Sequence, residues 1–299
     1  MMRRWCATFD DPNLVSCAGL VPVMRLAEDI GLHDAVADRV RLPTDKGANP
    51  AGKVATIVAG MLAGADSIDD LDIARHGGMR SLFTSVYAPS TLGSFLRTFS
   101  HGHVRQLQAA ARDTLIGLAG RAPILTGADV LTYVGIDSML RRVYGKQKQG
   151  IGFGHAKVGG YNVWLHGYNP LIATLSTPLS APVIAATRLR AGNAGSARML
   201  AETITTARSC GATGEIVVRA DSAFYAKTVI TTCRRHNVRF SVTTRIDAKS
   251  APRARASATT SGSTSNIRRP SGTRTSNGGS PTRRSLKPST PRSPALGMR

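Results

Sequence analysis

The sequence predicts an α/β protein in three parts: a helical N-terminal region (residues 1–125), a mixed sheet with helices (126–250) and a basic low-complexity tail (251–299). Apolar residues recur with helical spacing before residue 125, and short apolar runs typical of strands alternate with helical segments after it. Periodic apolar residues then disappear after Ser250. With 299 residues and 42% hydrophobic content, the chain can bury a substantial core.

The first region contains an amphipathic helix in the stretch NPAGKVATIVAGMLAG, with Asn49 as N-cap and Pro50 at the first helical position. Its apolar residues predict a buried stripe made of Val54, Ile57, Val58, Met61 and Leu62. The next stretch, DSIDDLDIARHGG, predicts a helix capped by Ser67 that stops at Gly77. Its acidic residues are therefore expected to stabilise a helix start rather than to catalyse.

Two further helices are predicted in APSTLGSFLRTFSHGHVRQLQ, joined by a short turn around Ser100. With Arg97, His101 and Arg105 near that turn, the pair could be a helix-turn-helix that reads DNA. A plain hairpin of two helices explains the pattern equally well. The sequence leaves both interpretations open.

After residue 126 the pattern changes to strands. Apolar runs at 131–136, 161–178 and 181–189 predict three strands, with turn residues Asn169 and Pro170 inside the second run. A helix at 196–211, a strand at 215–220, a helix at 223–237 and a strand at 238–245 follow. Three adjacent strands and then helix, strand, helix, strand predict a mixed sheet in the order of ribonuclease H-like domains.

The chain is strongly basic, with 39 Lys and Arg against 18 Asp and Glu, a net charge of +21. Residues 251–299 hold ten of the basic residues and no acid, so residues 1–250 keep a net charge of +11. This excess indicates a polyanionic partner, most often nucleic acid. No apolar run is long enough for a bilayer span, so we expect a cytoplasmic protein with no membrane partner. The four cysteines form no CxxC pair, which gives a zinc site little support.

Two aspartates end predicted strands. Asp137 follows YVGI and Asp221 follows EIVVRA. If the two strands are neighbours, both carboxylates emerge at one edge of the sheet, where they could share divalent metal ions for phosphoryl transfer. Alternatively, each aspartate caps the helix or turn that follows it.

Three segments carry a family resemblance: YVGIDSMLRRVYGKQKQGIGFGHAKVGGYNVWLHGYNPL, RLRAGNAGSARML and VVRADSAFY. They resemble the catalytic core of DDE transposases from bacterial insertion sequences, most closely the thirteen-eighty family, and the similarity extends to about Asp247. The resemblance implies that Asp137 and Asp221 are catalytic and bind Mg²⁺ or Mn²⁺. It also implies that the partner is double-stranded DNA at the inverted-repeat ends of the element, bound at the nucleoid and by a possible homodimer.

Supporting roles are expected for the residues around these acids. Phe224 and Tyr225 match the aromatic part of the second motif and could stack on an unpaired base, although core packing is expected for at least one of them. Several polar residues could hold DNA phosphates or could be ordinary surface residues. They are Lys146, Lys148, Lys157, Arg188, Arg190 and Asn193.

The resemblance also implies a third acid on a later helix, but no Asp or Glu follows Asp247. We therefore expect an incomplete catalytic core and a disordered tail that arises from a frameshift near 248–251. The tail could instead be a natural basic arm. Three hypotheses follow: a truncated and inactive transposase, a DNA-binding remnant that competes with the intact transposase, or a chain that does not fold stably.

Overall fold

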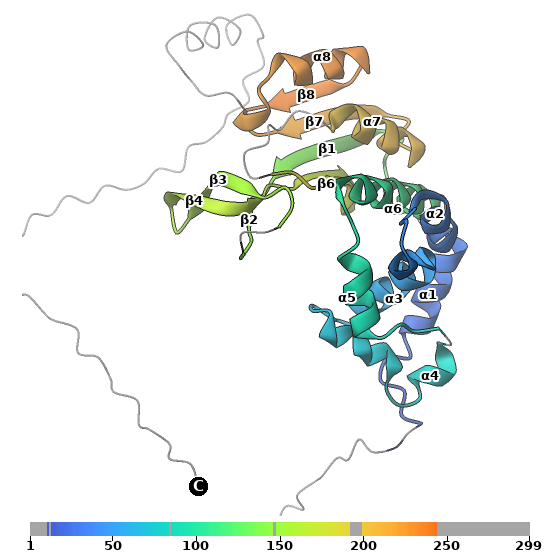
Figure 1. The fold of residues 1–299 in the computed structure, drawn as a ribbon. Helices are drawn as coiled ribbons and strands as arrows, with labels where there is room; N and C mark the ends of the chain where they lie inside the picture. The colour runs from blue at the N-terminus through green and yellow to red at the C-terminus, as the bar shows by residue number, and fades with distance from the viewer. Residues whose placement is uncertain (1–10, 12, 84, 146–147, 192–198, 244–299) are drawn as a thin grey trace, which may run out of the picture. The chain divides into compact units, whose positions relative to one another are not determined.

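The computed structural model describes residues 11, 13–83, 85–145, 148–191 and 199–243 (Figure 1). The chain divides into two units, Met1–Arg245 and Ile246–Arg299. The second unit, which includes the predicted disordered tail, lies outside the described residues. Within the first unit the α/β class is confirmed, with a helical N-terminal part followed by a mixed sheet.

The N-terminal part is built from short helices that pack around small apolar clusters. In chain order they are α1 (Leu20–Asp29), α2 (Leu32–Arg39), η1 (Asp45–Gly47), α3 (Pro50–Leu62), η2 (Asp69–Arg75), α4 (Met79–Leu82), α5 (Pro89–Leu96) and α6 (His101–Arg121). The elements named η are 3₁₀ helices.

Helix α3 begins as predicted, because the Asn49 side chain accepts a hydrogen bond from the backbone N–H of Gly52 at 3.1 Å. Its predicted buried stripe is correct only in part: Val54 packs against a core cluster, whereas Met61 is 64% and Leu62 54% exposed. The buried face instead consists of Ala51, Lys53, Thr56, Ala59 and Gly60. Small residues allow the neighbouring η2 to approach closely. A Cβ added at Gly60 would meet the side chain of Leu71.

The next helix, η2, is a 3₁₀ helix whose N-cap is Ile68, so the predicted cap Ser67 lies one residue too early. The hydroxyl of Ser67 donates to the Asp70 carboxylate at 2.6 Å, and the backbone N–H of Ser67 donates to the same oxygen at 3.0 Å. These hydrogen bonds lower the pKa of Asp70 from its ordinary value. Asp70 therefore has the structural role that its position in a first turn suggests.

An aromatic contact joins α5 to the short link that leads into α6. The rings of Phe95 and Phe99 meet edge to face, with centroids 5.0 Å apart. Ser100 and His103 then form the capping box of α6. The two helices have different main partners, because α6 packs on α2, β6 and α7 whereas α5 packs on α3, η1 and η2. Neither the DNA-reading motif nor the plain hairpin is established by this arrangement.

The main sheet has five strands in the order β6-β5-β1-β7-β8. Strands β1, β5 and β6 pair in antiparallel fashion, whereas β7 and β8 continue the sheet parallel to β1. This arrangement confirms the mixed sheet expected from the sequence. The bounds are β1 (Leu131–Ser138), β5 (Leu171–Thr177), β6 (Ser180–Arg188), β7 (Glu215–Ala220) and β8 (Arg239–Val242).

Helices α7 (Leu200–Ser209) and α8 (Lys227–Arg235) pack into the same core cluster as the sheet (Figure 1). Alternate residues of β1 and β7 point into this cluster, among them Val134 and Val218, which are fully buried. Asn237, with a left-handed backbone (φ 51°), lies in the turn between α8 and β8. The helices therefore cover one face of β1 and β7, and odd-numbered residues of these strands point to the other face.

A second, three-stranded sheet in the order β2-β4-β3 was not predicted as a separate sheet. Its strands are β2 (Arg141–Arg142), β3 (Gly152–Val158) and β4 (Tyr161–Tyr168), all antiparallel. The predicted strand region at 161–178 is split at Asn169 and Pro170, so that β4 belongs to this sheet and β5 to the main one. Proline has no N–H for a strand ladder, which explains a break there.

Among the described residues, no helix combines the length and the apolar character of a membrane span.

Candidate active site

The two strand-end aspartates come from adjacent parallel strands, as the sequence predicts. The last paired residues of β1 and β7 are Ile136 and Ala220, and Asp137 and Asp221 follow them directly. Each aspartate is therefore one residue past the same rung of the ladder. Because neighbouring strands lie about 4.8 Å apart and paired residues point to the same face, the backbone presents both carboxylates side by side.

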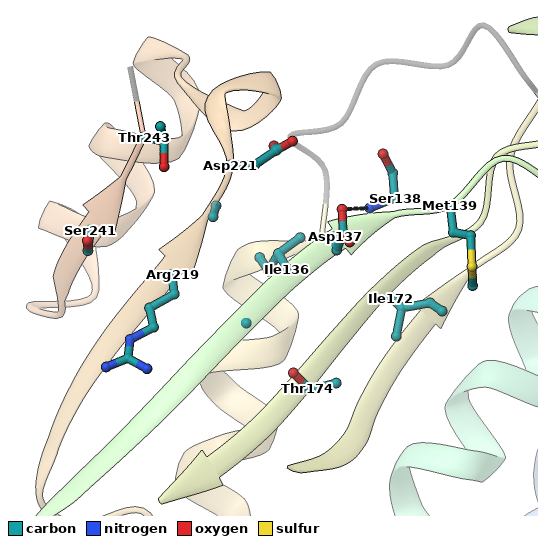
Figure 2. A pocket seen from close by; sticks show the side chains of 12 residues that line it. Ile136, Asp137, Ser138, Met139, Ile172, Thr174, Arg219, Asp221, Ser241 and Thr243 are labelled. Carbon is teal, nitrogen blue, oxygen red and sulfur yellow. Dashed lines mark hydrogen bonds between the residues drawn. The ribbon is translucent and has the colours of Figure 1, made fainter. Parts of the chain in front are cut away.

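A cavity of about 780 Å³ lies against this end of the sheet, on the face opposite the helices (Figure 2). Figure 2 shows Asp137 and Asp221 at the ends of their two strands, with Ser241 and Thr243 from the β8 side. Both carboxylates are exposed to solvent. The cavity is lined by Gly135, Ile136, Asp137, Ser138, Met139, Ile172, Thr174, Arg219, Ala220, Asp221, Ser241 and Thr243.

Each aspartate makes a hydrogen bond to the chain that follows it, and only that of Asp221 is a cap. Oδ1 of Asp137 accepts from the backbone N–H of Ser138 at 2.7 Å. Oδ1 of Asp221 accepts from the N–H of Ala223 at 3.0 Å and caps the 3₁₀ turn η3 (Ser222–Phe224). These bonds fix the two carboxyl groups near the chain that follows. Each bond engages Oδ1, and Oδ2 has no hydrogen bond to the described residues. These local bonds are therefore compatible with metal binding.

Arg219 is a site residue that the sequence reasoning missed. It lies two residues before Asp221, on the same face of β7, and lines the cavity (Figure 2). Its guanidinium carbon lies 3.4 Å from the centroid of the Tyr133 ring on β1, a cation–π arrangement that orients the side chain along the sheet. The alternation of residues in VVRAD was the available signal, since it places Arg219 and Asp221 on one face.

The aromatic pair of the second motif divides into two roles. Phe224 is 1% exposed and belongs to the main core cluster, which confirms the prediction that at least one of the pair is a core residue. Tyr225 is 59% exposed. Phe224 therefore anchors η3, the turn that Asp221 caps, to the interior.

Two of the lysines predicted to hold DNA lie in or beside the second sheet. Lys148 is exposed in the connection between β2 and β3, and Lys157 lies on β3 opposite Asn162. Lys146 and Asn193 lie outside the described residues. The DNA-binding role of these residues stays a prediction.

The two predicted arginines have partners within the protein. Arg188 has a side chain only 13% exposed and forms a 2.8 Å ion pair with Glu202 of α7. Arg190 donates from Nε to the carbonyl oxygen of Asn169 at 3.0 Å. Burial, and to a lesser degree the charge of Arg188, lower the pKa of Arg190 from its ordinary value. Both arginines thus link β6 to neighbouring elements, and their contact with DNA stays a prediction.

The residues present fit a divalent cation through their donor chemistry. Two exposed carboxylates at one cavity are oxygen ligands of the kind that Mg²⁺ and Mn²⁺ take. Within the described ranges there is no group of three or more His, Cys, Asp or Glu side chains that could hold a metal ion. Asp247, the last acid of the sequence, lies outside these ranges.

Comparison with known families identifies the chain. A family model described as "Transposase DDE domain group 1" matches residues 2–271, most of the sequence. The chain belongs to this DDE transposase family. The match extends past Asp247, where the resemblance was expected to end. A comparison with curated proteins found no match.

Solved structures of Mos1 transposase complexes are also similar to the chain at low identity. A pre-cleavage Mos1 transpososome is 10% identical, over 66% of this chain and 59% of the other, with a TM-score of 0.22. The Mos1 strand transfer complex is 10% identical, over 72% and 71%, with the same TM-score. The chain thus spans less than two thirds of the first structure. A TM-score of 0.22 is too low to establish a shared fold.

Proposed function

We propose that the protein is a DNA-binding transposase of a bacterial insertion sequence, and that Asp137 and Asp221 form its divalent-metal site. The observation that carries this proposal is the register of β1 and β7, which places the two acids one residue past the same rung at a cavity. The family membership supports the reaction class, since DDE denotes the acids on which these transposases depend.

The strand order supports a ribonuclease H-like core. Three antiparallel strands, β6-β5-β1, are extended by two strands parallel to β1, with helices between β6 and β7 and between β7 and β8. This is the topology expected from the sequence for such a domain. In it, the first acid belongs on the central strand and the second on the next parallel strand, the positions of Asp137 and Asp221.

The residues around the site fit a phosphodiester substrate. Divalent ions, when bound, would activate a nucleophile and stabilise the leaving oxygen in phosphoryl transfer. Asp137 and Asp221 would hold such an ion, each through Oδ2, which makes no hydrogen bond to the described residues. The guanidinium of Arg219 is stacked on Tyr133 and points away from the two carboxylates, and it adds a positive charge to the cavity wall that can attract the DNA backbone.

We further propose that this 299-residue chain binds element ends but does not cleave them. No acid follows Asp247 in the sequence, so residues 248–299 supply no third carboxylate. Phosphoryl transfer with two metals needs both ions fixed, and losing that arrangement lowers the rate about a thousandfold or more. Binding is expected to persist, because residues 1–250 alone carry a net charge of +11.

The test uses the purified chain with duplexes that end in the element's terminal inverted repeat or in random sequence. Fluorescence anisotropy at moderate salt should show tighter binding to the inverted repeat, whereas equal affinities would reduce binding to electrostatics and contradict the proposal. Cleavage is then followed on gels in Mg²⁺ and Mn²⁺. Cleavage by the unchanged chain that is lost in Asp137→Ala would show a complete site and contradict the proposed inactivity.

A second candidate function follows from the same lack of a later acid: a non-catalytic protein that competes with an intact transposase for the element's ends. Adding the chain to a transposition reaction of an intact relative should then reduce product formation in proportion to occupancy of the ends. Product formation that does not change at saturating chain would exclude this role. The proposed frameshift is tested separately, by reading the other frames of the encoding DNA past codon 248 for an acid-containing continuation.

A further inference from the structure

The second sheet presents an exposed ladder of aromatic rings that the DDE site does not use. Trp164 on β4 is 63% exposed and Phe153 on β3 is 59% exposed. Each contacts a histidine on the facing strand. The ring centroids of Trp164 and His155 are 3.9 Å apart, and those of Phe153 and His166 are 4.7 Å apart.

The register places these four rings on one face of the sheet. Phe153 lies opposite His166, and His155 lies opposite Trp164, in an antiparallel pair where facing residues share a side. We call the surface made by Phe153, His155, Trp164 and His166 the aromatic face. Tyr161, 77% exposed, is also on β4, but its odd-numbered position puts it on the opposite side from Trp164.

The segment that forms the second sheet carries basic residues and no acidic ones. Between Asp137 and Glu202 the sequence contains no Asp or Glu. The second sheet and its connections carry basic residues at positions 141, 142, 146, 148 and 157. Arg141 on β2 is exposed and pairs with Tyr168, which puts it on the same side of the sheet as Trp164, whereas Arg142 pairs with Gly167 on the opposite side. Exposed aromatic rings among uncompensated positive charges match a partner that combines flat rings with negative charge.

We propose that the aromatic face is a binding surface for single-stranded DNA, on which unpaired bases stack. DNA as the partner rests on the proposed function, whereas the base-stacking surface lies on a different sheet from Asp137 and Asp221. Bases within a duplex already stack on one another, so rings such as Trp164 gain stacking contacts only with bases that are unpaired. The basic residues that flank the face would hold the phosphates of the same strand.

The positive charge of the second sheet favours single-stranded DNA, rather than a second copy of this chain, as the partner that binds the aromatic face. Two copies that met through this face would bring together two surfaces without a single acid between residues 138 and 201, and like charges in an interface oppose association. A DNA strand brings one negative charge per nucleotide, which compensates the same surface.

The test measures binding of a labelled oligothymidylate of about 16 nucleotides, a length that covers the site of one single-strand binding module. Trp164→Ala in the full chain is expected to weaken this binding about tenfold, because the base that stacks on the Trp164 ring loses that contact. Trp164→Phe should recover most of the affinity. Tyr161→Ala is the matched control, an exposed aromatic residue of the same strand on the opposite side, and should bind as the unchanged chain does.

A direct readout separates stacking from charge. The chain has two tryptophans, Trp5 and Trp164, so a Trp5→Phe background reports on Trp164 alone. Adding the oligonucleotide should quench Trp164 fluorescence, and the loss of affinity in Trp164→Ala should persist at raised salt, where contacts by the basic tail weaken. Circular dichroism of each variant confirms that the fold is kept.

Three results would overturn the assignment. One is unchanged oligothymidylate affinity in a folded Trp164→Ala chain, and another is an equal loss of duplex and single-strand affinity. The third is dissociation of an oligomer by Trp164→Ala in sedimentation, which would make the face a protein interface. Failure of the proposed function looks different: the chain would bind no inverted-repeat duplex in preference to random sequence, while Trp164 still bound single strands.

Discussion

Replacing Phe224 by alanine should destabilise the protein strongly although the residue sits in a catalytic motif. Phe224 is 1% exposed and packs in the main core cluster, three residues after Asp221. Truncating a buried phenylalanine to alanine removes its burial energy and leaves a cavity, at a combined cost of about 3–5 kcal/mol. The adjacent Tyr225 is 59% exposed, so Tyr225→Ala should lower the free energy of unfolding by less than about 0.5 kcal/mol.

Urea unfolding followed by circular dichroism measures both effects. A loss of about 4 kcal/mol moves the unfolding midpoint by about 1–2 M urea for a slope of 2–3 kcal/mol/M. Since a domain has only about 5–15 kcal/mol of stability, Phe224→Leu provides a milder variant, expected to cost about 1 kcal/mol. Together the three variants separate packing at position 224 from the neighbouring exposed ring.

The reasoning would be refuted if Phe224→Ala and Tyr225→Ala lowered the free energy of unfolding equally, or if Phe224→Ala cost less than about 1 kcal/mol. Either result would mean that η3 is not anchored to the core through Phe224. Asp221 would then be positioned by its hydrogen bond to Ala223 alone.

Three further predictions concern the rest of the described chain. Lys53→Met should lower the free energy of unfolding in urea by about 2 kcal/mol. The buried Nζ donates to the carbonyl oxygens of Ala48 at 2.5 Å and Lys46 at 2.8 Å, and both oxygens would lose their donor. Gly167→Ala should speed amide hydrogen exchange across β2 and β4, because its Cβ would collide with the Arg141 carbonyl. Burial raises the pKa of the Cys210 and Cys233 thiols, so the folded state holds these protons more tightly and stability should fall as the pH rises through the thiol range. Thermal unfolding at a series of pH values checks this, and stability that rises with pH over that range would contradict it.

The main sheet was predictable because its strands are short apolar runs separated by turn residues. The register of Asp137 and Asp221 followed once the two strands were assumed to be neighbours, and the structure confirms that pairing. Burial of Phe224 was also anticipated. These inferences depend on local patterns, which the sequence displays directly.

Other features depend on contacts between distant residues and were missed. The apolar residues of α3 suggested a buried stripe at Met61 and Leu62, but its small residues form the buried face because they permit close approach by η2. The second sheet was missed because GFGHAKV is rich in glycine and weak in strand pattern, and its pairing with β4 supplies the order. No local signal distinguishes an arginine that binds DNA from Arg188, whose partner is Glu202 of α7.

The most direct test of the central claim is Mn²⁺ binding to the full chain, measured by electron paramagnetic resonance with Asp137→Asn, Asp221→Asn and the double variant. If the two carboxylates share an ion, each single change should weaken binding at least about tenfold, and the double change should add little because the shared site is already lost. Asp129→Asn, an exposed acid just before β1 at the other end of the strand, is the matched control and should leave binding unchanged. Affinities that are unchanged in the single variants, or reduced only as much as in the control, would contradict the account.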